Sequence, residues 1–138
     1  MTPAPTHLDC DVLIVGAGGA GMYAAIAAAR AGAARVLLLD KSLVGRGGAT
    51  IMAQMTVAAA LAEESDDDPD LHIADTLAAG RGLCDETLAA SLCEDAPARI
   101  REMEEWRVGW ARRDGGGIAQ VTAPGHSRPR APASSGCC

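Results

Sequence analysis

A cluster of glycines between two contrasting segments is the strongest constraint on how this chain can fold. Residues 11–15 (DVLIV) form a short apolar run rich in β-branched residues, which is typical of a strand buried on both faces. Residues 20–30 (AGMYAAIAAAR) have high helix propensity, and Gly32 follows as a helix terminator. Residues 35–40 (RVLLLD) form a second apolar run. The pattern predicts a strand, a helix and a second strand of a parallel sheet, which together make a βαβ unit.

The glycines of this segment follow the pattern G-x-G-x-x-G at Gly16, Gly18 and Gly21. The first makes a sharp turn, the second lets the backbone approach a pyrophosphate, and the third lets the helix pack close to the strand. Gly19 is an additional glycine, at the helix end whose N–H groups attract phosphates. Asp40 closes the second run, 19 residues after Gly21, where a carboxylate accepts hydrogen bonds from a ribose. The spacing therefore predicts a dinucleotide site, and the acid disfavours NADP.

The loop after Asp40 bears on which dinucleotide is bound, since the glycine motif does not separate NAD from FAD. The sequence GRGGAT places Gly47 and Gly48 between Arg46 and Thr50. Consecutive glycines beside a hydroxyl form a second place where backbone can approach a ligand. Such a loop suits a longer ligand that runs past the first turn, although an ordinary flexible loop is the alternative.

Composition excludes several classes of function. A formal charge of −6, from 18 acidic and 12 basic residues, argues against nucleic acid binding, which depends largely on neutralising phosphates. Five cysteines without a C-x-x-C pair are typical of reduced thiols in a cytoplasmic protein. No His or Cys lies at ligand spacing, so we expect no metal site. The start MTPAPTHLD lacks a basic n-region, and the chain has no uninterrupted apolar run of about 18 residues, so we expect neither a signal peptide nor a membrane span.

Helical patterns follow the glycine-rich segment. Apolar residues recur at helical spacing in residues 71–80, and either Asp68 or Asp70 can cap that helix. A second helix is predicted over residues 84–95, with Asp85 as its cap.

The remaining pattern predicts a third helix and a hairpin. Asp95 is expected to cap a helix that has Pro97 in its first turn, since proline is tolerated there. A hairpin follows, with its turn at residues 114–117 (DGGG). Residues after 123 have little to bury, and we expect them to be disordered.

These segments together resemble a known family. DVLIVGAGGAGMYAAIAAARAGAARVLLLDKS followed by GRGGAT resembles the amino-terminal FAD-binding segment of the fumarate reductase/succinate dehydrogenase flavoproteins, which include L-aspartate oxidase. HIADTLAAGRGLCDETLAASLCEDAPARIREMEEW is similar to the helical stretch of that family. RRDGGGIAQVTAPGHSRPR is similar to its hairpin and to the Gly-His-Ser-x-x-Arg loop after it. The resemblance covers residues 9 to 130, and its later segments make it more specific than the glycine motif alone.

The resemblance implies an α/β fold: a Rossmann-like FAD-binding βαβ unit with additional helices and an edge hairpin, forming an incomplete domain. Residues 1–9 would lead into an FAD-binding domain at residues 10–123, and residues 124–138 would form a disordered tail. The family implies hydride transfer between FAD and a dicarboxylate or amino dicarboxylate. A capping domain closes over that substrate and supplies an Arg that shuttles the proton. An iron-sulfur electron-transfer subunit is the partner that the resemblance implies.

Three departures from the family pattern qualify these expectations. Members with covalent FAD carry a His in an R-S-H-T stretch; here Arg46 matches the Arg and Gly48 takes the place of the His, so we expect non-covalent FAD. Met55 and Thr56 stand where the family has two glycines, which predicts a different path or a weaker approach to the flavin. The sequence ends at Cys138, before the capping domain of the family, so we expect the chain alone to be inactive.

The predicted site lies in the first third of the sequence. The residues expected at the cofactor are Gly16, Gly18, Gly19, Ala20, Gly21, Asp40, Lys41, Arg46, Gly47, Gly48, Ala49 and Thr50. Catalytic residues are not identified by any motif in the chain. The alternatives are an NAD-binding or non-catalytic dinucleotide-binding module, and an inactive fragment.

Four polar residues near the end of the chain are harder to place. His126, Ser127, Arg128 and Arg130 lie in the loop that resembles the family. A solvated tail is favoured for them over contact with the cofactor. For His72, a surface or helix-packing role is favoured over metal ligation, since no partner lies at ligand spacing.

Overall fold

The computed structural model describes residues 7–53, 57–63 and 65–133. The chain forms two compact units, Met1–Gln54 and Met55–Cys138, which are described separately. The predictions made for Met55 and Thr56 lie outside the described residues.

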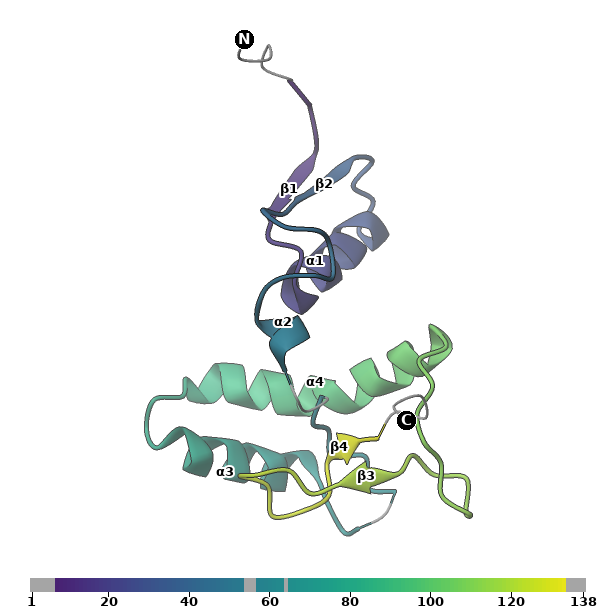
Figure 1. Ribbon diagram of the computed structural model, residues 1–138. Helices are drawn as coiled ribbons and strands as arrows, with labels where there is room; N and C mark the ends of the chain where they lie inside the picture. Colours follow the sequence, from purple (N-terminus) through teal and green to yellow (C-terminus); the bar gives the residue numbers. More distant parts are fainter. Residues whose placement is uncertain (1–6, 54–56, 64, 134–138) are drawn as a thin grey trace. The chain divides into compact units, whose positions relative to one another are not determined.

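The first unit contains the predicted βαβ arrangement (Figure 1). Its elements are β1 (Val12–Val15), α1 (Gly19–Arg30), β2 (Val36–Leu39) and the short α2 (Ala49–Met52). The two strands are parallel, with Val12 opposite Val36 and Val15 opposite Leu39. Gly32, with a φ of 96°, follows the end of α1 as predicted, since this backbone conformation suits glycine. The predicted fold class is therefore confirmed.

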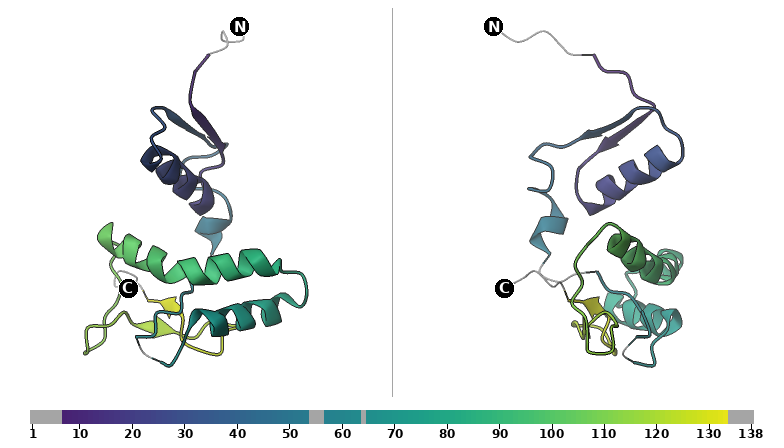
Figure 2. Two further views of the ribbon diagram at one scale, coloured as in Figure 1. Left: turned by 180° about the vertical axis from the view of Figure 1, so that it is seen from behind. Right: turned by 90° about the vertical axis from the view of Figure 1, so that its right-hand side faces the viewer.

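The two faces of this small sheet differ. Helix α1 packs against both strands and lies alongside them in Figure 2. Ile14 faces the helix, whereas the side chains of Leu13 and Val15, on the other face, are 53% and 81% exposed. The prediction that the first strand is buried on both faces is wrong within the described structure. An apolar run of this kind suits a sheet covered by helices on both sides, but α1 covers only one.

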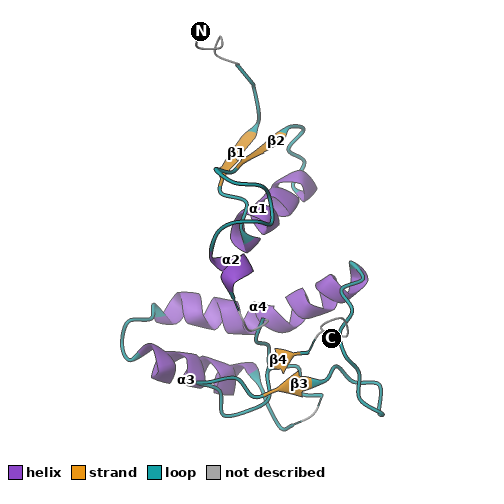
Figure 3. Cartoon of the chain, in the orientation of Figure 1, coloured by secondary structure: helices purple, strands orange, loops and turns teal. Residues whose placement is uncertain are grey.

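The second unit is built on two helices, α3 (Pro69–Gly80) and α4 (Glu86–Glu105), which pack against each other (Figure 3). Asp68 caps α3 by accepting a hydrogen bond from the N–H of Leu71 at 2.8 Å. Asp85 caps α4 through the N–H of Leu88 at 3.0 Å. Asp85 was the predicted cap and Asp68 was one of the two candidates for α3, because a carboxylate satisfies an N–H group that has no partner within the helix.

Helix α4 is continuous where two helices were expected. Asp95 does not cap a helix, and Pro97 lies inside α4. A proline within a helix removes one hydrogen bond and crowds the preceding turn. The buried face of α4 nevertheless runs through the proline without a break, at Ala89, Cys93, Ala96 and Ile100. Packing along this stripe outweighs the local break signal, since tertiary burial dominates helix stability.

A small antiparallel pair completes the second unit. The predicted turn is present, because Arg112 and Ile118 form a bridge and the N–H of Arg113 donates to the carbonyl of Gly117 at 3.0 Å. Strands β3 (Gln120–Val121) and β4 (Ala131–Pro132) then pair. The core contains Ala59, Ala96, Ile100 and Ile118.

The expectation of a disordered tail from residue 124 does not fit residues 124–133. Ala131 lies in β4 and is 1% exposed, and Arg130 is completely buried. The stretch has little apolar surface, but it is fixed by strand pairing and by charged contacts described below. In the described part of the chain, no helix has both the length and the apolar character needed to cross a membrane.

Candidate dinucleotide site

The turn between β1 and α1 brings the glycine motif to the carboxyl end of the sheet. Gly16 has a φ of 109°, a conformation that favours glycine, and its N–H donates to the carbonyl of Leu39 at 2.7 Å. Gly18 is the N-cap of α1 and has extended backbone, without a side-chain cap. The N–H groups of the first helical turn have no partners within the helix. They form a positive end suited to a phosphate.

Gly21 has the packing role that the motif predicts. A Cβ atom at this position would lie 1.8 Å from the carbonyl oxygen of Gly16 and 3.5 Å from Cγ2 of Ile14. The first of these atoms belongs to the backbone and cannot move without shifting the turn. Glycine is therefore required here by the close approach of α1 to β1.

Gly18 is different, because nothing in the fold itself requires glycine there. Its φ is −75°, which any residue can adopt, and a Cβ would lie 3.5 Å from Oγ1 of Thr50, an ordinary contact. The motif predicts glycine at this position where a ligand approaches the turn from outside. A bound pyrophosphate is such a group.

Asp40 and the first glycine line one cavity of about 340 Å³, together with Val15, Leu39 and Lys41. Asp40 directly follows β2. Its Oδ1 accepts the N–H of Lys41 at 3.0 Å. The cavity lies where two parallel strands end, the usual position of ligands in open α/β sheets.

The second glycine loop returns to the helix N-terminus. Gly48 has a φ of 82° and is the N-cap of α2, which begins with Ala49. Thr50 Oγ1 accepts a hydrogen bond from the N–H of Gly19 at 2.9 Å. The two glycine segments are thereby brought together, as expected for a ligand that contacts both. Arg46 is exposed, and its N–H donates to the carbonyl of Leu43 at 2.9 Å.

The remaining predicted residues also lie in the first unit. Ala20 belongs to the first turn of α1, and Lys41 lines the cavity beside Asp40. All the residues predicted at the cofactor therefore lie on the turn after β1 and the start of α1, directly after β2, or on the second glycine loop and the start of α2. Among the described residues, no group of three or more His, Cys, Asp or Glu side chains could hold a metal ion.

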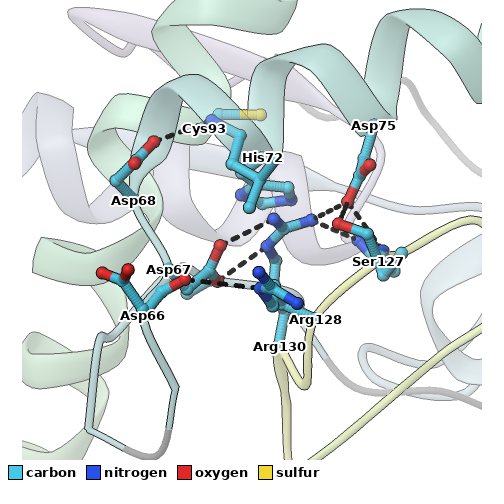
Figure 4. A network of polar contacts seen from close by, with 12 residues as sticks. Asp66, Asp67, Asp68, His72, Asp75, Cys93, Ser127, Arg128 and Arg130 are labelled. Carbon is cyan, nitrogen blue, oxygen red and sulfur yellow. Dashed lines mark hydrogen bonds and ion pairs between the residues drawn. The ribbon is translucent and has the colours of Figure 1, made fainter.

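A buried charged cluster in the second unit was missed by the sequence reasoning (Figure 4). The guanidinium of Arg130 is completely buried and bonds both oxygens of Asp67, through Nε at 2.8 Å and Nη2 at 2.7 Å. Its Nη1 contacts Oδ2 of Asp75 at 2.5 Å. Asp75 also accepts the N–H and the hydroxyl of Ser127, each at 2.7 Å. The favoured solvated-tail interpretation is wrong for Arg130, whereas Ser127 is exposed but held by its hydrogen bonds to Asp75.

Electrostatics in the cluster follow from this geometry. Burial raises the pKa of Asp75, but the two hydrogen bonds from Ser127 and the contact with Arg130 outweigh it and lower the pKa to about 2. Burial, followed by the charge of Arg130, lowers the pKa of His72. Of the surface and helix-packing roles favoured for His72, only helix packing fits, because this residue is 2% exposed. His126 lies beside His72, with ring centroids 5.4 Å apart, and its Nδ1 is 3.3 Å from Nη1 of Arg130.

No local signal in the sequence pointed to this cluster. Arg130 is separated from Asp67 by 63 residues and from Asp75 by 55 residues, so no helical or strand period links them. The only usable signal was the Gly-His-Ser-x-x-Arg resemblance, at Gly125 to Arg130. Arg128, in the same loop, is exposed and its Nε donates to the carbonyl of Asp66 at 3.3 Å.

A parallel βαβ unit with a glycine turn at the helix N-terminus and an acid at the end of the second strand defines a dinucleotide-binding domain. The sequence model of a family described as "FAD binding domain" matches residues 11–136. The chain therefore belongs to this FAD-binding domain family, and the predicted resemblance is confirmed. FAD is the cofactor of the family.

Relatives of known type agree with this assignment. L-aspartate oxidase of Mesorhizobium japonicum is 38% identical over 94% of this chain and 24% of its own length. The succinate dehydrogenase flavoprotein subunit of Coxiella burnetii is 37% identical over 86% of this chain and 20% of its own length. Among solved structures, a chain of the Mycobacterium smegmatis Sdh1 complex in the apo form has a TM-score of 0.85 and 35% identity, covering 91% of this chain and 21% of that chain. The chain thus spans about a fifth to a quarter of these relatives.

Proposed function

We propose that the first unit binds FAD non-covalently and that the chain is the cofactor-binding part of a flavin-dependent oxidoreductase. The observation that carries the proposal is that three features lie in one unit: the acid after β2, the glycine turn at the start of α1, and the second glycine loop that leads into α2. Asp40 and Gly16 line one cavity, and Gly19, at the start of α1, is hydrogen-bonded to Thr50. A ligand with a ribose, two phosphates and a longer second half has a contact for each part.

The residues present fit such a ligand. Asp40 would accept hydrogen bonds from the ribose of the adenosine half. Gly18 leaves room for a pyrophosphate at the N-terminus of α1. Gly47, Gly48 and the Thr50 hydroxyl would contact the part of the ligand beyond the phosphates. When bound, FAD would supply hydride chemistry at its isoalloxazine ring.

Gly48 supports non-covalent attachment. The described loop has a glycine where, by the resemblance, covalently flavinylated members of the family carry a histidine, so position 48 supplies no imidazole for the bond. Flavin released by acid denaturation, without proteolysis, would support this part of the proposal. Flavin that remains attached to the denatured chain would contradict it.

We further propose that the reaction served by this module is hydride transfer between flavin and a dicarboxylate or amino dicarboxylate. The support is similarity to proteins named L-aspartate oxidase, succinate dehydrogenase flavoprotein subunit and fumarate reductase subunit. By the same similarity, an iron-sulfur subunit is the proposed electron partner, and the cytoplasm is the proposed location. The reaction requires a closed substrate site.

Reconstitution tests the binding proposal. The purified chain is incubated with FAD, passed through a desalting column and examined for the visible absorbance band of oxidised flavin. Retention of flavin in equal proportion to protein is expected. Parallel calorimetric titrations with FAD and NAD separate the two dinucleotides, since both share the adenosine half. Tighter binding of NAD would favour an NAD-binding module, and no binding of either would indicate an inactive fragment.

A further inference from the structure

Ser42 holds the carboxylate that we propose to bind ribose. Its hydroxyl donates a hydrogen bond to Oδ2 of Asp40 at 2.9 Å, while the N–H of Lys41 donates to Oδ1 at 3.0 Å. The carbonyl of Leu43, at 3.4 Å, is a more distant and neutral alternative for the same hydroxyl. A charged acceptor at shorter distance is preferred. Both oxygens of Asp40 are thus fixed from the protein side.

The number of acceptor positions left on Asp40 is informative. An ionised carboxylate has about four lone-pair positions on its two oxygens. Lys41 and Ser42 use one on each oxygen, which leaves about two. A ribose diol has two hydroxyls that can donate to them. A phosphate on either hydroxyl would remove a donor and bring a second negative charge to Asp40.

Asp40 needs an anchor because it is exposed. Its bond to the adjacent N–H of Lys41 fixes one oxygen only. Without the second bond the carboxylate can rotate, and a ligand would have to order it on binding, at a cost in conformational entropy. The Ser42 hydroxyl removes that cost before the ligand arrives.

We infer that Ser42 is a positioning residue that orients Asp40 toward a ribose with both hydroxyls free, and so contributes to selection of an unphosphorylated adenosine ribose. The inference rests on the proposed function, since it concerns the same cavity. It adds a residue that the glycine motif does not include. Through Ser42, the predicted contact of Asp40 with ribose depends on the glycine at position 47.

Gly47 supports this role from the other side of the loop. A Cβ at position 47 would lie 2.3 Å from the Ser42 hydroxyl oxygen and 3.2 Å from its Cβ. The backbone of Gly47 does not have a positive φ, so space and not conformation accounts for the glycine. Glycine at this position therefore leaves room for the hydroxyl that holds Asp40.

The test is calorimetric titration of the full chain with two probes, ADP and 2′,3′-dideoxy-ADP. Ser42→Ala is expected to weaken ADP binding about three- to tenfold, the usual range for loss of one hydrogen bond. Its affinity for the dideoxy probe should not change, because that probe offers no hydroxyl to Asp40. Ser42→Thr keeps the hydroxyl and should bind ADP within about threefold of the unmodified chain.

Each other outcome contradicts the inference in a recognisable way. Equal losses for both probes in Ser42→Ala would mean that Ser42 merely supports the loop. Unchanged affinity for ADP would mean that Asp40 needs no anchor. If the unmodified chain binds neither ADP nor FAD, the proposed function itself fails, and this inference fails with it. Binding by the unmodified chain with no effect of Ser42→Ala overturns the inference alone.

Discussion

The hydroxyl of Thr50 accepts a hydrogen bond from the backbone N–H of Gly19 at 2.9 Å, across 31 positions of the sequence. This bond fixes the start of α2 against the N-terminus of α1, where a pyrophosphate is proposed. Thr50→Val keeps the shape of the side chain and removes the acceptor. We expect FAD affinity to fall about three- to tenfold, as measured by quenching of flavin fluorescence. Thr50→Ser is the control, and should bind normally; an unaffected Thr50→Val variant would show that this bond has no part in binding.

The two glycines at the start of α1 are predicted to fail in different ways. Gly21→Ala places a methyl group 1.8 Å from the backbone oxygen of Gly16, and should destabilise the first unit by about 1–3 kcal/mol. Gly18→Ala meets only an ordinary contact at 3.5 Å, so its stability cost should stay below about 1 kcal/mol. Gly18→Ala should nevertheless weaken FAD binding at least about tenfold, because a single misplaced methyl group at a close approach costs over 1 kcal/mol. Hydrogen exchange of residues 12–39 measures stability, and flavin titration measures binding.

The reverse result would be decisive. A Gly18→Ala variant that binds FAD as well as the unmodified chain would place the pyrophosphate elsewhere. A Gly21→Ala variant with unchanged exchange rates would mean that the turn can shift at no cost.

Asp40→Asn tests the ribose contact. The amide keeps the size of the side chain but loses the charge, and one of its two groups can no longer accept a hydrogen bond. Affinity for ADP should fall by about 1–3 kcal/mol, the range for bonds to a charged group. Calorimetry measures the loss. The exposed Asp114, in the hairpin turn of the second unit, provides the matched control: Asp114→Asn should leave the affinity unchanged.

Acid should destabilise the second unit through Asp75. The pKa of this carboxyl is about 2 in the folded chain, against an ordinary value of 3.8. The ionised form therefore stabilises the fold fully above pH 3.8, and that contribution is lost as the pH falls toward 2. Both tryptophans, Trp106 and Trp110, lie in this unit, so tryptophan fluorescence reports its unfolding. Asp75→Asn should be less stable at neutral pH and should show a shallower loss between these pH values; an unchanged acid profile would contradict the assignment.

Arg130 is expected to be the most sensitive position of the second unit. Arg130→Ala leaves the carboxylates of Asp67 and Asp75 without their buried cation, and should cost about 3–5 kcal/mol of unfolding free energy. Urea denaturation followed by tryptophan fluorescence gives the value. Arg128→Ala removes the exposed neighbour and should cost less than about 1 kcal/mol. Similar losses in the two variants would show that the buried contacts of Arg130 are not the source of stability.

The contrast between the two units shows what local sequence can reveal. The strand, helix and strand around Gly16 and Gly21 were predictable, because the apolar runs and the glycine spacing are both local signals. Asp95 and Pro97 were interpreted as the start of a new helix because they also form a local signal: an acid that can cap a helix, followed by a proline in the first turn. The stripe of buried side chains that overrides it depends on contacts with distant segments such as Ala59 and Ile118. No period in the sequence reports such contacts.

Arg130 shows the same limit for charged residues. An arginine in a stretch of prolines and small residues is usually solvated, and its burial becomes favourable only when carboxylates are supplied. Those carboxylates come from the N-cap region of α3 and from α3 itself. Sequence reasoning narrowed the cap of α3 to Asp68 or Asp70, because a cap acts within one helical turn. It had no means of assigning Asp67, one residue before Asp68, to a partner 63 residues away.

The position of Arg130 in the sequence also orders events during synthesis. The contacts of the first unit are made within Met1–Gln54, so we expect the βαβ segment to form before the second unit, in keeping with the tendency of amino-terminal domains to fold first. Helices α3 and α4 are made next, but Asp67 and Asp75 stay hydrated until the segment that carries Arg130 has emerged. Arg130 follows both helices and the hairpin in the sequence, so we expect its burial to complete the charged cluster after they are made. We therefore expect co-translational folding to be vectorial, with the charged cluster formed only after α3, α4 and the hairpin have been made.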